Sequence, residues 1–101
     1  MGNNDDKLDE AIEAPHAELE VRDNREASRF EATIDGQIGF LEYERQPNAF
    51  VFMHTEVPES LRGHGVANRL AKVGLDTARA EHLPVVARCP FVRAYLRKHH
   101  A

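Results

Sequence analysis

The sequence contains one cysteine and no long apolar run. Of its 101 residues only Cys89 carries a thiol, which excludes a disulfide within the chain and fits a reducing compartment. It has no stretch of about 18 apolar residues and no charged-then-apolar leader, so neither a membrane span nor export through the Sec pathway is indicated. We therefore expect a cytoplasmic protein with one domain, large enough for a single core.

The chain also lacks two well-known phosphate-binding sequences, although it has a glycine loop. The loop reads Arg62-Gly63-His64-Gly65-Val66-Ala67 and lies between a strand-like run and a helical pattern. A Walker loop needs a lysine and then a serine or threonine after its last glycine, and Val66 stands there instead. A dinucleotide fingerprint needs a third glycine at position 68, which is Asn68. Nucleoside triphosphate hydrolysis and dinucleotide binding are therefore poorly supported.

What remains is a loop suited to an anion at the start of a helix. The first N–H groups of a helix have no partner within it, and its dipole is positive at that end. Gly63 and Gly65 remove the Cβ atoms that would keep a pyrophosphate away, and Arg62 adds a forked cation. Two glycines before a helix also commonly form an ordinary turn, so the loop alone leaves both interpretations open.

Acidic residues are scarce in the second half of the chain. Residues 1–18 hold six acids against one lysine, and we expect them to form a flexible tail that could include a short helix at 8–14. Residues 62–101 hold eight lysines and arginines against two acids. Such a bias usually marks a solvated surface, but its coincidence with the glycine loop favours an anionic ligand.

The hydrophobic pattern predicts an α+β fold for residues 19–101, in which antiparallel strands precede a strand-helix-strand unit and a short final helix. Asp35-Gly36 is a strong hairpin signal, Asp23-Asn24 predicts an earlier turn, and Gly39 indicates a bulge or a close contact. The predicted strands are 19–21, 29–34, 37–44, 49–57 and 85–87, and the predicted helices run from 66 to about 80 and from 90 to about 98.

This order of elements resembles the GNAT superfamily of acyl-CoA N-acyltransferases, whose pyrophosphate loop has the form Arg/Gln-x-x-Gly-x-Gly/Ala. Arg62, Gly65 and Ala67 fill its defined positions. The chain is similar in more detail to a small subfamily, the YjdJ-type minimal acetyltransferases, with a His-Thr-x-Val strand and a Cys-Pro-Phe-Val element. Here these read His54-Thr55-Glu56-Val57 and Cys89-Pro90-Phe91-Val92, and the similarity covers about residues 25–99.

The resemblance implies bound acetyl-CoA or coenzyme A. Its pyrophosphate would lie on the N–H groups of the loop, and its pantetheine arm would pair with the strand edge that opens where two parallel strands splay apart. Arg62, Arg69, Lys72 and Arg93 are candidate partners for its phosphates. The residues expected to bind it are Val57, Arg62, Gly63, His64, Gly65, Val66, Ala67, Cys89 and Arg93.

The resemblance also implies direct transfer of an acetyl group, with a base that takes the proton of an amine and an acid that protonates the thiolate. Cys89 is expected to line the thioester site. The alternatives are a covalent acetyl-cysteine intermediate and a buried thiol with no part in the reaction. His54 and Glu56 share one face of a strand, so either could be the base, or the histidine could be structural. Tyr95 is the acid by loose analogy, or an aromatic that packs its helix.

Two functions from different classes remain. The leading one is an N-acetyltransferase that acts on a small-molecule or peptide amine, and the alternative is a module that binds acyl-CoA with little chemistry. Compared with larger superfamily members, the chain lacks the two helices that wall the acceptor site. We therefore expect that pocket to be open or completed by another chain, self-association included. The histidines lack a spacing such as His-Glu-x-x-His, which argues against a metal site. The basic second half of the chain carries no known nucleic-acid-binding motif, which argues against nucleic acid as a ligand.

Overall fold

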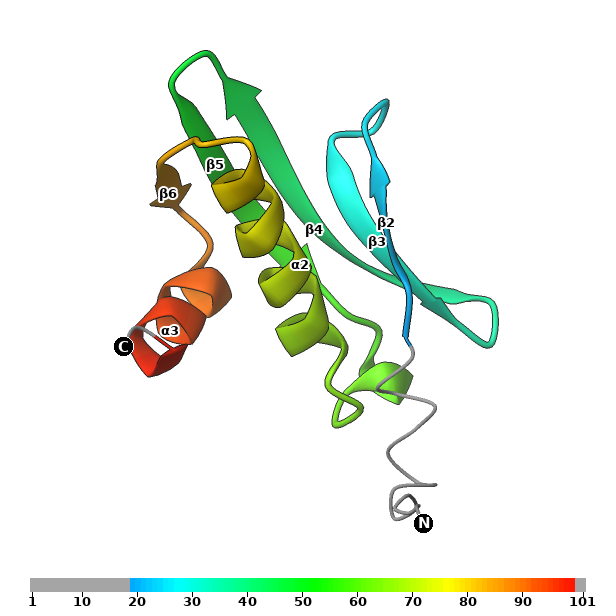
Figure 1. The fold of residues 1–101 in the computed structure, drawn as a ribbon. Coiled ribbons are helices and arrows are strands. Elements are labelled where there is room, and N and C mark those ends of the chain that lie inside the picture. The colour runs from blue at the N-terminus through cyan, green and yellow to red at the C-terminus, as the bar shows by residue number, and fades with distance from the viewer. Residues whose placement is uncertain (1–18, 100–101) are drawn as a thin grey trace, which may run out of the picture.

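A computed structural model describes residues 19–99 of the chain. The predicted tail over 1–18, with its helical piece at 8–14, lies outside the described residues. In the described part, strands form one sheet, and two α-helices and a short 3-10 helix complete the fold (Figure 1). The bounds are β2 (Val21–Asn24), β3 (Arg29–Ile34), β4 (Gln37–Gln46), β5 (Ala49–Glu56), η1 (Glu59–Leu61), α2 (Val66–Ala80), β6 (Val85–Ala87) and α3 (Pro90–His99).

The sheet is mixed. Its strands lie in the order β2-β3-β4-β5-β6, and every neighbouring pair is antiparallel except β5 and β6, which are parallel and joined through α2. The predicted α+β fold is thereby confirmed, with its antiparallel first part, its strand-helix-strand unit and its short C-terminal helix. No helix within residues 19–99 is long and apolar enough to cross a membrane.

The β3–β4 hairpin turns at Asp35 and Gly36, as predicted. Their φ angles are 52° and 77°. Two positive φ values in a two-residue loop define a type I′ turn, whose twist matches that of the flanking strands. β4 continues to Gln46, two residues beyond its predicted end at Glu44, because its last residues pair with the start of β5.

The first strand is displaced from its predicted position. The sequence predicts a strand over 19–21 and a turn at Asp23-Asn24, but β2 includes both of these residues and the turn follows it. Pairing with β3 extends the strand to Asn24, and the Asn24 side chain then shapes the turn. Its amide donates to Glu31 of β3 (3.0 Å), and its oxygen accepts from the Ala27 N–H (3.1 Å). Asparagine favours turns, and Asn24 closes this turn from the last position of β2.

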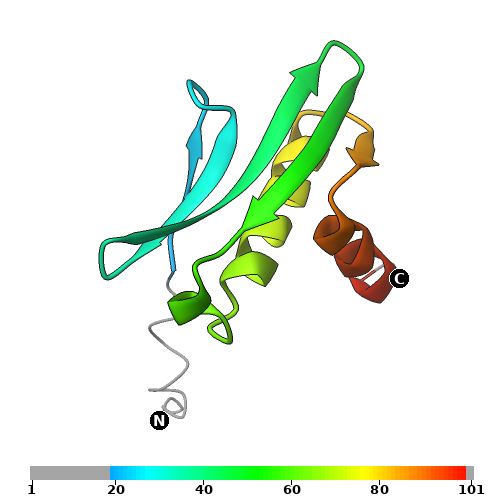
Figure 2. The ribbon, with the colours of Figure 1, turned by 180° about the vertical axis from the view of Figure 1, so that it is seen from behind.

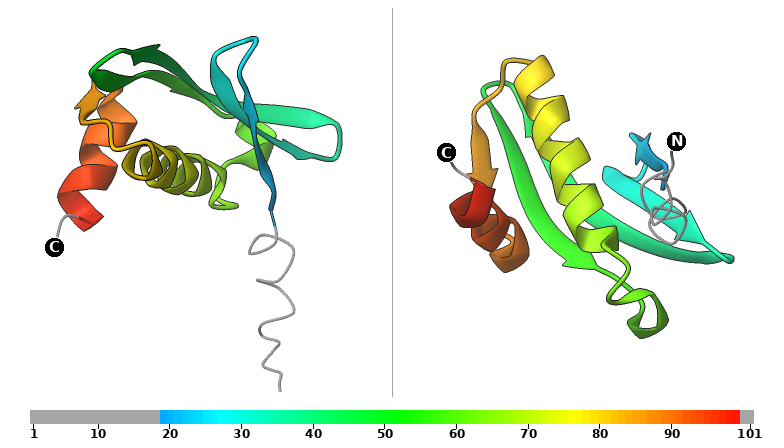
Figure 3. Two further views of the ribbon diagram at one scale, coloured as in Figure 1. Left: turned by 45° about the horizontal axis from the view of Figure 1, so that its top comes forward. Right: turned by 60° about the horizontal axis from the view of Figure 1, so that its bottom comes forward.

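The core lies between the sheet and α2. α2 crosses one face, α3 lies beside it near β6 (Figure 3), and no helix of the described chain covers the other face (Figure 2). A Cβ atom at Gly74 would lie 2.8 Å from the Phe52 ring, so the glycine permits the close approach of α2. Gly39 is a close contact and not a bulge, since a Cβ there would lie 3.0 Å from Val66. The largest fully buried side chains are Phe30, Phe50, Phe52, Leu41, Leu70, Val66, Val92 and Cys89.

A β-bulge occurs in β5 at Met53. Glu42 of β4 pairs with His54, and the next residue, Tyr43, pairs with Phe52, so Met53 is the extra residue. An extra residue shifts the alternation of side chains along the rest of the strand by one.

The bulge places consecutive residues of β5 on different surfaces. Phe52 faces the core, and beyond the bulge Val57 packs against the core while Thr55 reaches a buried thiol at the start of α3. The exposed side chains of His54 and Glu56 face away from α2. Simple alternation from Phe52 would have put His54 and Glu56 in the core.

The parallel pairing of β5 and β6 ends abruptly. It runs from Phe50 to Phe52 on β5, and the Phe52 carbonyl then accepts from the N–H groups of both Arg88 (2.9 Å) and Cys89 (3.0 Å). α3 starts at the next residue. Beyond Phe52, no strand of residues 19–99 pairs with β5 on this side.

Arg45 fastens the C-terminal end of α2 to the sheet. Its guanidinium donates to both carboxylate oxygens of Glu81, the C-cap of α2 (3.0 and 2.8 Å), and to Asp23 (3.0 Å) and the Tyr43 hydroxyl (2.7 Å). These bonds from Arg45 hold the pKa of Glu81 below its usual range. Burial, followed by the hydrogen bond to Asp23, raises the pKa of Tyr43.

Candidate functional site

The glycine loop leaves the N-terminal end of α2 uncapped. Gly63 and Gly65 have φ angles of 86° and 76°, which favour glycine, and Gly65 is the N-cap residue. No side chain caps the helix, and its first turn holds no acidic residue. A Cβ atom at either glycine would meet nothing within 4 Å, so the space in front of the helix is open. The donor N–H groups and the positive end of the dipole suit an anion.

A pocket of about 430 Å³ lies at this helix end; we call it the loop pocket. Predicted residues supply most of its lining, and His64 is not among them. Leu61, Asn68 and Phe91 were not predicted as site residues. The predicted residues that line it are Val57, Arg62, Gly63, Gly65, Val66 and Ala67.

A second pocket, of about 410 Å³, runs along the end of β5; we call it the strand pocket. Val57, Arg62, Ala67 and Phe91 line both the strand pocket and the loop pocket, so the two form a continuous groove. The groove runs from the bare end of α2 to the part of β5 that has no strand partner on the β6 side. It therefore offers an elongated ligand an anion site, an apolar wall and an unpaired strand edge.

The two candidate bases lie together at this groove. His54 and Glu56 both line the strand pocket, and the His54 Nε2 atom is 3.2 Å from a carboxylate oxygen of Glu56. The His54 ring also packs edge-on against Phe40, with 6.4 Å between ring centroids. The prediction that the two side chains share a face is confirmed. An imidazole held by a carboxylate and open to solvent can accept a proton from a substrate.

Cys89 lies behind the groove and not in its wall. Its side chain is 2% exposed, and its sulfur is 3.1 Å from the hydroxyl oxygen of Thr55, which does line the strand pocket. Cys89 directly precedes the first residue of α3, and its carbonyl accepts from the Arg93 N–H, as expected at a helix start. Its role at the thioester stays a prediction, and Thr55 separates it from the groove.

Tyr95 lies in a third pocket. This pocket, of about 310 Å³, is lined by α3 and by Asn68 of α2; we call it the α3 pocket. Tyr95 therefore does not share a pocket with His54 and Glu56, and its role as the acid stays a prediction. Arg93 is exposed and lines none of the three pockets.

Among the predicted phosphate partners, Arg62 alone lines the groove. Arg69 donates to the Leu19 carbonyl (3.3 Å), and Lys72 forms an ion pair with Asp76 (2.8 Å). The hydrogen bond from Lys72 lowers the pKa of Asp76. Arg62 is therefore the best-placed cation for an anion in the loop pocket.

Sequence reasoning missed the residue that joins the pockets. Phe91 lines all three of them, and Thr55 links the groove to Cys89. The signal for Phe91 was its place in the Cys-Pro-Phe-Val element, just inside a predicted helix start. Its side chain matters because α3 packs beside the bare end of α2, which local sequence does not reveal.

Comparison with known proteins agrees with this geometry. Residues 29–101 match the family model described as GCN5-related N-acetyl-transferase. Protein NATD1 of Xenopus tropicalis is 30% identical over 87 residues, which are 83% of this chain and 80% of that protein. Protein NATD1 of Gallus gallus and of Mus musculus are each 31% identical over 83 residues, 79% of this chain and 76% of theirs. The chain therefore belongs to the family of GCN5-related N-acetyltransferases.

Proposed function

We propose that this chain transfers the acetyl group of acetyl-CoA to an amine, by direct attack of the amine on the thioester. The observation that carries the proposal is the groove that joins the uncapped end of α2 to the unpaired edge of β5. Coenzyme A carries a pyrophosphate followed by an amide-containing arm. The pyrophosphate matches the uncapped end of α2, and the arm matches the unpaired edge of β5. Family membership supports the same reaction.

In this proposal the residues of the loop pocket hold the pyrophosphate. The first N–H groups of α2 donate to it, and Arg62 neutralises part of its charge. Gly63 and Gly65 matter because both line the loop pocket, so a side chain at either would add atoms to its wall. The arm then follows β5 toward Thr55, where unpaired backbone groups can bind its amides. The bound thioester supplies the acyl group.

His54 and Glu56 are the proposed proton route. Glu56 orients the imidazole, and His54 takes the proton that the amine loses as its nitrogen forms a bond to the acyl carbon. The C–S bond then breaks, and the protonated imidazole can return a proton to the thiolate. This assignment is favoured over Tyr95 because His54 and Glu56 line the groove, whereas Tyr95 lines the α3 pocket.

The acceptor is an amine of a small molecule or a peptide, and it approaches from the sheet face that carries His54 and Glu56. No helix of residues 19–99 covers that face (Figure 2). Membership of the YjdJ-type subfamily is part of this proposal, supported by the juxtaposition of its two elements, since Thr55 contacts Cys89.

A thermal shift assay tests donor binding. Acetyl-CoA should raise the melting temperature, while ATP and NAD at equal concentration should leave it unchanged, because a ligand of the native state stabilises it by mass action. Arg62→Gln should reduce the shift, and Arg79→Gln, an exposed cation near the far end of α2, should not. No response to acetyl-CoA would contradict the proposal.

A second candidate function is a module that binds acyl-CoA with little chemistry, and the uncovered acceptor face favours it. Turnover with a panel of small and peptide amines separates the two functions. Tight binding of acetyl-CoA without transfer to any amine would support the module. For the enzyme, formation of an acetylated protein that is lost in Cys89→Ser would replace direct attack by the covalent route.

A further inference from the structure

The described part of the chain begins beside the bare end of α2. Leu19, its first residue, is 6% exposed and belongs to the core. The Arg69 side chain donates to the Leu19 carbonyl (3.3 Å), and the Arg69 N–H donates to the carbonyl of Gly65, the N-cap of α2 (3.0 Å). One arginine side chain therefore separates Leu19 from the first turn of α2. Residues 1–18 are attached to the fold at this point.

Residues 1–18 carry a strong negative charge; we call them the acidic segment. It holds six carboxylates and one lysine. The carboxylates are Asp5, Asp6, Asp9, Glu10, Glu13 and Glu18. Because an extended chain advances about 3.3 Å per residue, Glu13 and Glu18 cannot be more than about 20 Å from Leu19. At least two carboxylates are therefore confined to the neighbourhood of the bare helix end.

The surface at this point is positively charged and has no acids of its own. Arg62 lines the loop pocket, and Arg69 lies one helical turn beyond Gly65. Within residues 19–99, neither arginine forms an ion pair, and no carboxylate lines the loop pocket. The start of a helix and a guanidinium both stabilise a carboxylate. The acidic segment thus supplies the groups that this surface lacks.

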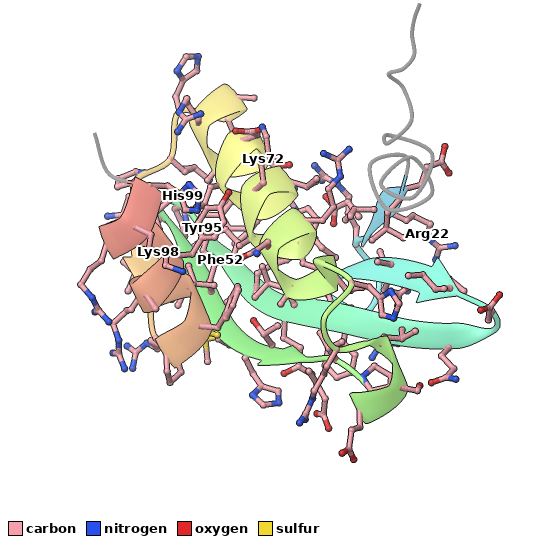
Figure 4. All side chains as sticks on the ribbon, turned by 90° about the horizontal axis from the view of Figure 1, so that it is seen from below. Arg22, Phe52, Lys72, Tyr95, Lys98 and His99 are labelled. Carbon is pink, nitrogen blue, oxygen red and sulfur yellow. The ribbon has the colours of Figure 1, made fainter. Side chains whose placement is uncertain are left out.

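Other surfaces suit the acidic segment less well. The uncovered face of the sheet presents Glu42, Glu44 and Glu56, with which no lysine or arginine of residues 19–99 pairs, so it would repel the segment. Lys98 of α3 lies across α2 from Arg22 of β2, the strand that follows Leu19 (Figure 4). A tethered group binds best where its tether spans the distance easily. A solvated segment would also explain the charge, but it would not need attachment beside an anion site.

We propose that the acidic segment occupies the loop pocket when no donor is bound, and so competes with the pyrophosphate of acetyl-CoA. The inference rests on the proposed function, since it is a regulation of the same anion site. An occupied pocket cannot accept the pyrophosphate, so the apparent dissociation constant of acetyl-CoA rises by the inverse of the free fraction. A segment that fills the pocket for about nine-tenths of the time raises that constant about tenfold.

Calorimetric titration of the full chain with acetyl-CoA tests this. Conversion of all six carboxylates of the acidic segment to amides gives the six-amide variant, which should bind acetyl-CoA about tenfold more tightly than the wild type. Glu13→Gln/Glu18→Gln should tighten binding about threefold, because these two carboxylates lie nearest the helix end in sequence. Glu26→Gln/Glu44→Gln is the matched control. It removes the same charge from exposed residues that line none of the three pockets, and it should leave the affinity unchanged. Equal gains in the two double variants would overturn the inference.

Arg62→Gln separates contact in the pocket from repulsion at a distance. If the acidic segment binds at the loop pocket, the tenfold gain should fall to about threefold or less when Arg62→Gln is present in both backgrounds. An unchanged gain would mean long-range repulsion and would overturn the inference. A labelled peptide of residues 1–18 should bind the six-amide variant at about millimolar concentration or below, and acetyl-CoA should displace it. No binding, or binding of the peptide and acetyl-CoA together, would overturn the inference as well.

The two proposals fail separately. If the wild type binds acetyl-CoA and the six-amide variant binds it no more tightly, the acidic segment is not a competitor and the proposed function stands. If the peptide binds through Arg62 but neither form of the chain binds acetyl-CoA, the contact of the segment with the loop pocket stands and the acetyltransferase proposal is wrong.

Discussion

The two ends of α2 are built in opposite ways. At the C-terminal end, Glu81 is bound by Arg45, which also binds Asp23 and Tyr43. At the N-terminal end, Gly65 provides no cap, no acid occupies the first turn, and a pocket adjoins the helix. One end has its partners within the chain, and the other leaves its donors for something else.

This difference separates stability from binding. A helix end whose charged groups are paired adds to the free energy of unfolding, since breaking the pairs exposes unpaired partners. An uncapped end gives up a cap worth about 1 kcal/mol and keeps donors for an anion. Substitutions at the C-terminal end should therefore lower the stability of the fold without changing ligand affinity. Those at the N-terminal end should change ligand affinity much more than stability.

The largest effect is expected from a carboxylate at the N-cap. Asp and Asn are the residues that best tolerate a positive φ, and a Cβ at Gly65 meets no atom within 4 Å. Gly65→Asp and Gly65→Asn should therefore both fold, with a similar backbone strain of about 1 kcal/mol. Two charges about 4 Å apart repel by about 4 kcal/mol near a protein surface, so Gly65→Asp should weaken acetyl-CoA binding at least about 100-fold. Gly65→Asn should weaken it about tenfold or less. Titration calorimetry measures both, and equal losses would show that charge is not the cause.

Removal of the proposed base should have the next largest effect. His54→Gln should lower kcat about 100-fold and abolish the dependence of kcat on pH near neutrality, because general base catalysis contributes on that order. The KM for acetyl-CoA should stay within about twofold. Glu44→Gln, an exposed carboxylate on β4 away from the three pockets, is the control. An unchanged pH profile in His54→Gln would remove this residue from the proton route.

At the opposite end of α2, Arg45→Gln should destabilise the fold by about 2 kcal/mol. It removes the hydrogen bonds from the guanidinium and leaves Glu81 and Asp23 with only the longer ion pairs to Arg25, at 3.5 and 3.7 Å. The melting temperature should fall by about 10 °C, as is usual for a domain of this size. Acetyl-CoA affinity at 20 °C should not change. Arg22→Gln, which removes only a long contact from a 73% exposed side chain (3.9 Å to Glu31), should cost at most about 0.5 kcal/mol. A parallel loss of binding in Arg45→Gln would break the comparison.

The smallest expected effect is on the pH dependence of stability. The pKa of Glu81 is lowered in the folded state, chiefly by the hydrogen bonds from Arg45. A lowered pKa gives stability that is present above the ordinary glutamate value of about 4.3 and is lost as the pH falls through the folded value. Urea unfolding between pH 3 and 6 should therefore show a shallower acid slope in Arg45→Gln than in the wild type. Identical slopes would mean that this carboxylate does not contribute.

Local signals predicted much of the fold and part of the site. The Asp35-Gly36 turn, the glycines before α2 and the start of α3 at Pro90 depend on a few adjacent residues, and each appears where predicted. Asp23 and Asn24 were wrongly predicted as a turn, because pairing with β3 prevailed over composition.

Features that depend on distant parts of the chain could not be predicted. The Met53 bulge depends on how β4 and β5 align, and nothing in the β5 sequence specifies it. Arg45 and Glu81 are 36 positions apart and meet only because α2 ends beside β4. The sequence left Tyr95 as either the acid or an aromatic that packs its helix, and it did not reveal that Tyr95 lines a different pocket from His54.

The bulge at Met53 has a consequence for how this protein can change. Because of the extra residue, neighbouring positions on β5 face opposite sides of the sheet: Thr55 and Val57 face the core, and His54 and Glu56 face the open side, although all four line the strand pocket. Packing against α2 therefore does not constrain His54 and Glu56, and under the proposed function the proton route alone does. One inserted or deleted residue in this strand would exchange the two sides and remove the proposed proton route, while the bare end of α2 stayed as it is.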